Sequence, residues 1–279
     1  MKSNYRYIVK AFMAMAVIAG TTSCDDFLDR EPMSSISPET YYSTAAQLEA
    51  NLNDEYPNVL PSFGQWTYGI FGEDKGTDNQ IEVNANDRYT QDRWKVPHSE
   101  SDNWKFERIY RINFFLSEAL PKFGEDMSGS QNTISGSVAT IKHYIGEMYF
   151  LRAYEYFKKL QLFGDFPIID QPLADEMEAL REASKRFPRN EVARFIISDL
   201  DKAYAYMSDV DMATTRINKD AAMLVKSRVA LFEATWLQNF KGTAFVPGGE
   251  GWPGASLHNN YQYPSGNLDN EVKYFLEQA

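Results

Sequence analysis

Apolar side chains recur at helical spacing through residues 138–163, in the middle of the chain. Steps of three and four residues place them on one face of an α-helix, and neighbouring apolar residues widen that face. Gly164 follows the last periodic position and Pro167 comes soon after, which predicts that the helix ends there. Arg152 lies within this apolar surface, so we expect it to make an ion pair or a backbone contact. The stripe consists of Ile141, Ile145, Tyr149, Ala153, Phe157 and Leu160.

Other segments show the same period, with polar residues that suit helix starts. Ser37 and Pro38 read as a cap and a first helical position. Because proline lacks the backbone N–H and disfavours helix continuation, Pro57 and Pro121 are predicted to stop the first two of these helices. The further predicted helices span residues 37–56, 103–120, 190–207, 218–239 and 269–279.

Two pairs of these helices are predicted to form helical hairpins. The pairs are 103–120 with 138–163, and 190–207 with 218–239. Stacked hairpins are typical of tetratricopeptide-like arrays, although the repeat spacing is irregular and the consensus repeat residues are absent. No run with the alternation of a strand is convincing. The sequence therefore predicts an all-α fold with long irregular loops.

The longest aperiodic stretch, residues 57–100, combines aromatic side chains with Asn and Asp. Sugar rings stack on Trp and Tyr, while amide, carboxylate and guanidinium groups bond the hydroxyls. This composition predicts a ligand platform, and the alternative is that the aromatics pin the loop onto the helices. The candidate ligand-binding residues are Trp66, Tyr89, Trp94, Asn86, Asp87 and Arg88.

The N-terminus has the layout of an export signal. Residues 1–23 carry a basic start, a ten-residue apolar run and small residues, and Cys24 follows as the only cysteine. We predict a lipoprotein signal peptide at 1–23, acylation of Cys24 and a polar tether at 24–36. Thr21 stands where a strict lipobox has Leu, so ordinary secretory cleavage with a spare thiol is the alternative.

Charge and motifs exclude several classes of function. The formal net charge of −11 disfavours nucleic acid as a partner. The three histidines are scattered, and no phosphate-binding loop or nucleophile elbow is present, so we expect no catalytic residue, no cofactor and no metal centre. A loose surface calcium site at residues 74–78 is left open.

Several segments resemble the SusD/RagB family of outer-membrane nutrient-uptake lipoproteins. The most specific is GEMYFLRA at 146–153, continuing to FGDFP at 163–167. The others are CDDFLDREP at 24–32, the Trp104 to Asn113 segment, and the stretch 188–229. Family members are longer, so residues 37–279 resemble a SusD-like N-terminal helical domain that is truncated at the C-terminus.

The resemblance implies a non-catalytic lipoprotein of a Bacteroidota-type outer membrane, facing the cell surface. Such a protein captures glycan or peptide nutrients and delivers them to a SusC-like TonB-dependent transporter. Asp25 and Asp26 resemble the acidic surface-export signal of these lipoproteins. Two alternatives stay open, a helical-repeat adaptor that binds only protein and an α-helical glycan hydrolase.

Overall fold

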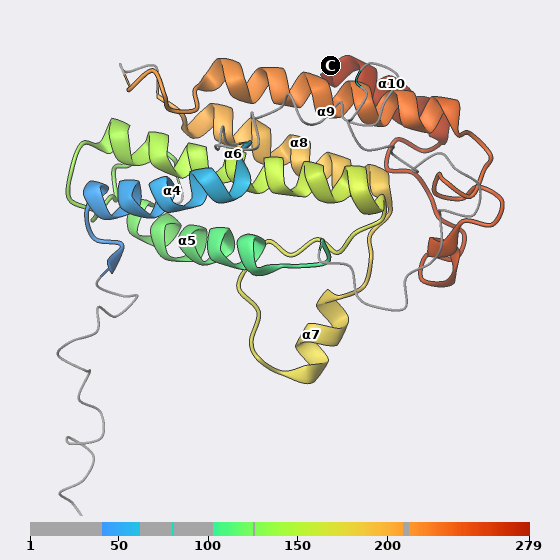
Figure 1. Ribbon diagram of the computed structural model, residues 1–279, viewed down its shortest axis with the longest axis horizontal. Helices are drawn as coiled ribbons and strands as arrows, with labels where there is room; N and C mark the ends of the chain where they lie inside the picture. Colours follow the sequence, from blue (N-terminus) through green and yellow to red (C-terminus); the bar gives the residue numbers. More distant parts are fainter. Residues whose placement is uncertain (1–40, 62–79, 81–102, 125, 209–211) are drawn as a thin grey trace, which may run out of the picture. The chain divides into compact units, whose positions relative to one another are not determined.

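The computed structural model describes residues 41–61, 80, 103–124, 126–208 and 212–279 (Figure 1). Residues 42–279 form one compact unit. Within the described residues the secondary structure is helical, with isolated bridges and no extended strand, which confirms the all-α prediction. None of the described helices is both long and apolar enough to cross a membrane. The helices are α4 (Ala45–Val59), α5 (Glu107–Phe123), α6 (Val138–Phe163), α7 (Met177–Ala183), α8 (Arg189–Tyr206), α9 (Lys219–Asn239), the 3₁₀ helix η3 (Pro253–Ser256) and α10 (Leu268–Gln278).

Helix α6 is the centre of the array. It packs against α4 and α5 on one side and against α8 on the other, while α9 packs on α8 and α10 packs on α9 (Figure 1). Helices α5 and α6, and likewise α8 and α9, run antiparallel as the two predicted hairpins. The Ser137 side chain accepts a hydrogen bond from the Thr140 N–H at the start of α6, and Gly164 ends the helix with φ +67°. All six residues of the predicted α6 stripe are buried, and so are most of the side chains on the other faces of this helix.

A glycine allows α6 and α8 to approach closely. A Cβ at Gly146 would lie 2.8 Å from the backbone N of Met207 and 2.9 Å from the carbonyl O of Ala203. Both atoms belong to the backbone, so a side-chain rotation cannot relieve the overlap. Gly146 therefore sets the spacing of the largest helix contact in the unit.

Arg152 makes the ion pair that the sequence predicted. Its Nε and Nη2 donate to the two carboxylate oxygens of Asp199 on α8, at 2.7 and 2.8 Å. Its Nη1 donates to Asn113 Oδ1 on α5 and to the carbonyl O of Asp170, each at 2.9 Å. One buried guanidinium thus joins α5, α6 and α8, and its donors pair the buried oxygens of Asp199 and Asn113.

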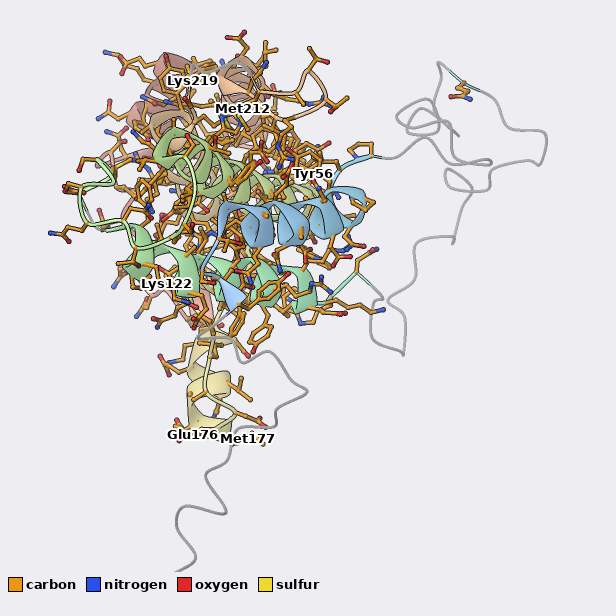
Figure 2. All side chains as sticks on the ribbon, turned by 90° about the vertical axis from the view of Figure 1, so that its left-hand side faces the viewer. Tyr56, Lys122, Glu176, Met177, Met212 and Lys219 are labelled. Carbon is orange, nitrogen blue, oxygen red and sulfur yellow. The ribbon has the colours of Figure 1, made fainter. Side chains whose placement is uncertain are left out.

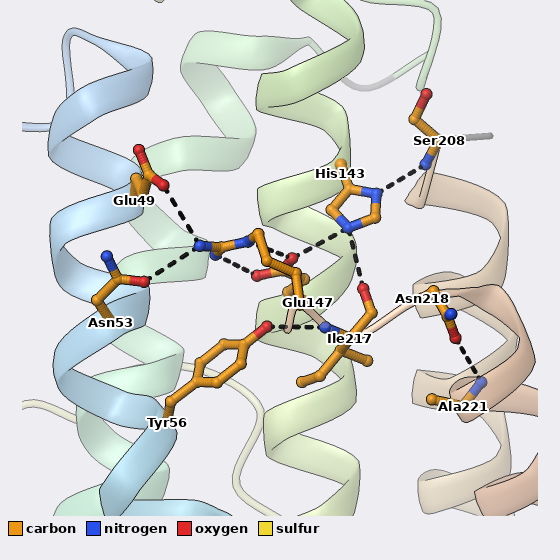
Figure 3. A network of polar contacts seen from close by, with 10 residues as sticks. Glu49, Asn53, Tyr56, His143, Glu147, Ser208, Ile217, Asn218 and Ala221 are labelled. Carbon is orange, nitrogen blue, oxygen red and sulfur yellow. Dashed lines mark hydrogen bonds and ion pairs between the residues drawn. The ribbon is translucent and has the colours of Figure 1, made fainter. Parts of the chain in front are cut away.

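A second polar network joins α4 and α6 to the segment before α9 (Figure 3). Arg216 donates from Nε and Nη2 to the two carboxylate oxygens of Glu147, at 2.8 and 2.5 Å. His143 Nδ1 accepts the Ser208 N–H at 3.1 Å, so the proton of a neutral His143 is on Nε2, which lies 3.0 Å from the carbonyl O of Ile217. These contacts use their donors and acceptors within the fold, which indicates a structural role.

Two predicted helix ends were wrong. Helix α4 runs through Pro57 to Val59 and α5 runs through Pro121 to Phe123. Each proline lies in the last turn, where it removes one helical hydrogen bond and few others depend on it. Helix α4 begins at Ala45 behind a capping box made by Thr44.

The start of α5 also differs from its prediction. The helix begins at Glu107 rather than at 103. Trp104 and Phe106 instead pack on Phe166, with ring centroids 4.9 and 5.1 Å apart, so this contact holds residues 104–106 outside the helix. By contrast, α6, α8, α9 and α10 begin and end within about one residue of their predicted bounds.

Helix α7 was not predicted. It lies in a projecting segment, residues 171–186, which we call the α7 arm (Figure 1). None of the helix's residues is buried, and Glu176 and Met177 lie at its far end, away from the other helices (Figure 2). At the base of the arm, Phe166 and Phe187 exchange two backbone hydrogen bonds of 3.1 and 3.0 Å. A seven-residue helix that buries nothing carries no apolar stripe, so periodicity could not find it.

Candidate ligand-binding site

A pocket of about 470 Å³ lies at the end of the array where α6 and α9 terminate. Loop residues 242–266, which follow α9, lie at this same end (Figure 1). We call this cavity the end pocket. Its wall includes the last turn of α6, Gly164 and Asp165 after it, Arg189 at the start of α8, and loop residues from Ala244 to Leu257.

The loop that forms this wall is fixed by its own contacts. Trp252 is buried and donates its indole N–H to Asp165 Oδ2 at 2.8 Å, while Tyr263 donates its hydroxyl to the carbonyl O of Pro247 at 2.6 Å. Gly249 passes so close to the carbonyl O of Thr243 that a Cβ would lie 1.9 Å from it. The aromatic and glycine content of the loop therefore gives an ordered wall.

The floor of the end pocket is a buried ion pair. Arg189 and Glu233 are 4% and 0% exposed, and Arg189 Nε and Nη2 donate to the carboxylate at 3.0 and 2.9 Å. The guanidinium lies 4.0 Å from the centroid of the Trp236 ring, a cation–π contact. Burial raises the pKa of Glu233, and the Arg189 guanidinium opposes that shift.

Asp165 links the floor to the loop. Its Oδ1 accepts the backbone N–H of Arg189 at 2.9 Å, and its Oδ2 accepts the Trp252 indole N–H. Burial raises the pKa of the Asp165 carboxyl, and the two donors pull it the other way. Asp165 thus positions both the start of α8 and the loop around the cavity.

Large apolar side chains gather at the mouth of the end pocket. Leu162, Phe245 and Leu257 are 58%, 61% and 54% exposed, and all three line the cavity. Arg186 is exposed beside them, and its guanidinium lies 4.6 Å from the centroid of the Trp104 ring. A mostly apolar site with a few fixed polar groups suits a ligand with both apolar and polar faces, such as a sugar.

A smaller cavity of about 230 Å³ lies between α5 and the α7 arm. Its lining is mainly apolar and includes Phe106, Ile109, Tyr110 and Leu180. It offers few groups that could orient a polar ligand. Among the residues that the structure describes, no group of three or more His, Cys, Asp or Glu side chains could hold a metal ion.

The sequence-predicted site residues lie outside the described part of the chain. This applies to the acylation site Cys24 and to the six platform residues, so both assignments stay predictions. The end pocket was missed by sequence reasoning, although a usable signal was present. Residues 242–266 carry aromatics among Gly and Pro, the kind of composition that singled out residues 57–100. The predicted platform residues are Trp66, Tyr89, Trp94, Asn86, Asp87 and Arg88.

Comparison with known proteins identifies the family. Residues 26–231 match the SusD-like family described as "Starch-binding associating with outer membrane", and the chain belongs to it. The match covers α4 to α8 and most of α9. The recognition made from the sequence segments is therefore confirmed.

Individual relatives agree with this assignment. The chain is similar to SusD-like protein P2 of Formosa agariphila, 25% identical over 253 residues, which are 86% of this chain and 46% of that protein. SusD-like protein P25 of the same organism is 25% identical over 233 residues, 77% of this chain and 41% of that protein. The chain thus spans somewhat under half the length of the curated relatives it matches.

A solved structure shares the fold. A SusD-like protein from Bacteroides fragilis superposes with a TM-score of 0.52 at 22% identity, covering 76% of this chain and 39% of that one. The tetratricopeptide-like helical hairpins are therefore the SusD-like arrangement.

Proposed function

We propose that the protein is a non-catalytic glycan-binding lipoprotein that passes its ligand to a SusC-like TonB-dependent transporter in the outer membrane. The observation that carries the proposal is the end pocket, an apolar-rimmed cavity with fixed polar groups in a chain of the SusD-like family. Peptide is the alternative ligand class. The family description, which names starch binding, favours glycan.

Two surfaces contribute to ligand capture in this proposal. The end pocket holds one saccharide unit against Phe245, Leu162 and Leu257. Trp66, Tyr89 and Trp94 add a second, stacking platform, as the sequence predicts. Loops carried by a rigid helical scaffold are where binding residues concentrate.

Acylated Cys24 tethers the protein to the outer membrane, with the helical domain facing the cell surface. The support is the tripartite leader that ends at the only cysteine of the chain. Cys24→Ala is expected to release the protein into the soluble fraction or to leave it unprocessed, as detected by detergent partitioning and N-terminal mass. Membrane partitioning equal to that of the wild type would contradict the anchor.

The ligand-binding proposal is tested by calorimetric titration with a panel of neutral and acidic oligosaccharides and peptides. Phe245→Ala removes an exposed apolar side chain at the mouth and is expected to cost about 1–3 kcal/mol of binding free energy. Leu231→Ala, an equally accessible apolar residue on α9 outside the pocket, is the matched control and should bind as the wild type does. Equal affinity of both variants would contradict the pocket as the site.

Two further measurements separate the competing classes of function. Co-purification with a barrel transporter, together with glycan binding, supports the proposal. Transporter or other protein binding without affinity for any glycan or peptide would favour a helical adaptor. Release of reducing sugar from a bound glycan would favour a hydrolase.

A further inference from the structure

The end pocket presents hydrogen-bond donors that make no hydrogen bond with the part of the chain that the structure describes. Arg189 faces Glu233 with Nε and Nη2, so its Nη1 is at the other edge of the planar guanidinium. This nitrogen lies 3.6 Å from where a Cβ of Gly164 would sit, beside the pocket wall. Within the described chain, no acceptor lies within hydrogen-bond distance of Arg189 Nη1.

The second group is Arg186 at the mouth. Its guanidinium carbon lies 4.6 Å from the centroid of the Trp104 ring, and its side chain makes no ion pair or hydrogen bond with the described residues. A cation–π contact with the ring uses none of the N–H donors of a guanidinium, so those of Arg186 stay available to a ligand. A planar guanidinium with unused edge donors can bind an oxyanion with two parallel hydrogen bonds.

The carboxylates at the same pocket already accept hydrogen bonds from the protein. Asp165 uses one oxygen for the Arg189 backbone N–H and the other for the Trp252 indole. Glu233 is fully buried behind Arg189, and both of its oxygens accept from that guanidinium. Among the described residues, the pocket therefore has guanidinium donors on two arginines that make no hydrogen bond, its carboxylate oxygens already accept hydrogen bonds, and Gln161 adds a neutral amide to the lining.

The two arginines of the end pocket present positive charge in a protein that is acidic as a whole. The whole chain carries a formal net charge of −11, which repels anions at long range. Charge beyond the Debye length of about 8 Å is screened at physiological salt, whereas a partly buried guanidinium acts at contact distance. An anionic ligand would thus be held by hydrogen bonds from the two guanidinium groups. The net negative charge of the protein would not attract it from a distance.

We propose that the end pocket selects a saccharide unit bearing an anionic substituent, either a uronate carboxylate or a sulfate ester. Arg186 binds the oxyanion at the mouth, Arg189 Nη1 donates to the ligand from the floor, and the sugar ring packs against Phe245 and Leu257. The inference rests on the proposed glycan-binding function and adds the class of glycan.

The first test compares ligands that differ only in the anionic group. Oligogalacturonide is titrated against its fully methyl-esterified form, and a sulfated galactan oligosaccharide against its desulfated form. The acidic member of at least one pair should bind roughly tenfold or more tightly, because a charge-assisted hydrogen bond is lost in the neutral one. A preference in the first pair alone identifies the carboxylate, and a preference in the second alone identifies the sulfate.

Two outcomes overturn the inference, and they differ in whether the proposed glycan-binding function survives. If neutral and acidic members bind equally, the glycan-binding function stands and anionic selectivity fails. If no member of the wider panel of glycans binds, the proposed function fails and the inference fails with it.

The second test assigns the selectivity to Arg186. Arg186→Gln should abolish most of the acidic preference, and raising the salt concentration should then weaken its binding less than that of the wild type. Lys185→Gln is the matched control, because Lys185 is the exposed neighbouring cation, pairs with Glu182 and does not line the pocket. Melting temperatures of both variants confirm folding. Full acidic preference in a folded Arg186→Gln variant would overturn the assignment.

Discussion

Trp252 and Asp165 are 87 positions apart, and a 2.8 Å hydrogen bond joins the indole Nε1 to the carboxylate Oδ2. This bond ties the loop after α9 to the turn after α6. The same carboxylate also accepts the first N–H of α8, so one side chain holds three segments at the end pocket. Asp165 is therefore a junction between the pocket wall and the helices behind it.

Trp252→Phe is expected to lower the free energy of unfolding by about 1.5–3 kcal/mol, the usual contribution of a hydrogen bond to a charged group. Urea denaturation followed by circular dichroism measures the change. Trp236→Phe is the comparison, because its indole donates to the carbonyl O of Phe245 in a neutral and exposed bond, while a Phe ring keeps an aromatic face towards Arg189, so the change should cost about 1 kcal/mol. A larger loss in Trp236→Phe would contradict the central role of Asp165.

Arg152→Met is expected to destabilise the protein by about 3–5 kcal/mol, because buried Asp199 loses its bidentate partner and keeps only Lys202 Nζ, at 3.8 Å. The double variant Arg152→Met/Asp199→Leu removes both charges and should be less destabilised than the single variant. Chemical denaturation of both variants gives the coupling. If the double variant were the less stable of the two, the isolated charge would not be the cause.

Gly146→Ala should cost about 1–3 kcal/mol or more, since the new Cβ overlaps the backbone of α8. Met207→Ala removes the flexible side chain near that Cβ and leaves the two backbone contacts in place. It should therefore fail to rescue Gly146→Ala in a thermal melt. Full rescue would show that the Met207 side chain, rather than the helix backbone, sets the spacing.

Glu271 provides a pH-dependent part of the stability. Burial raises the pKa of the Glu271 carboxyl, but hydrogen bonds from Arg194, Asn190 and Ser265 outweigh that effect. The net result is a pKa lower than that of an ordinary glutamate. A carboxyl with a lowered folded-state pKa contributes stability above its unfolded pKa and loses it as pH falls through the folded value. Unfolding free energies of the wild type and Glu271→Gln should therefore differ at neutral pH and converge in acid. A constant difference across this range would contradict the linkage.

Sequence periodicity predicted the helices that bury a stripe, because burial imposes the helical period on side-chain type. It could place Arg152 in the core but could not name Asp199 as its partner, since that pairing depends on how α8 crosses α6. The non-helical segment before α5 was missed for a similar reason, because Trp104 is held by Phe166 across the fold. The end pocket brings together residues from four separated segments, and no local pattern encodes that convergence.

Helix α7 buries none of its residues, and two backbone hydrogen bonds close the base of its arm. The arm can therefore open locally while the helices behind it stay folded, and its amides should exchange with solvent long before those of α6. A protease cut between Glu176 and Ala183 would leave two fragments that the helix contacts still hold together. The same property makes helix α7 itself, none of whose residues lines the end pocket, a suitable place to insert a fluorescent reporter.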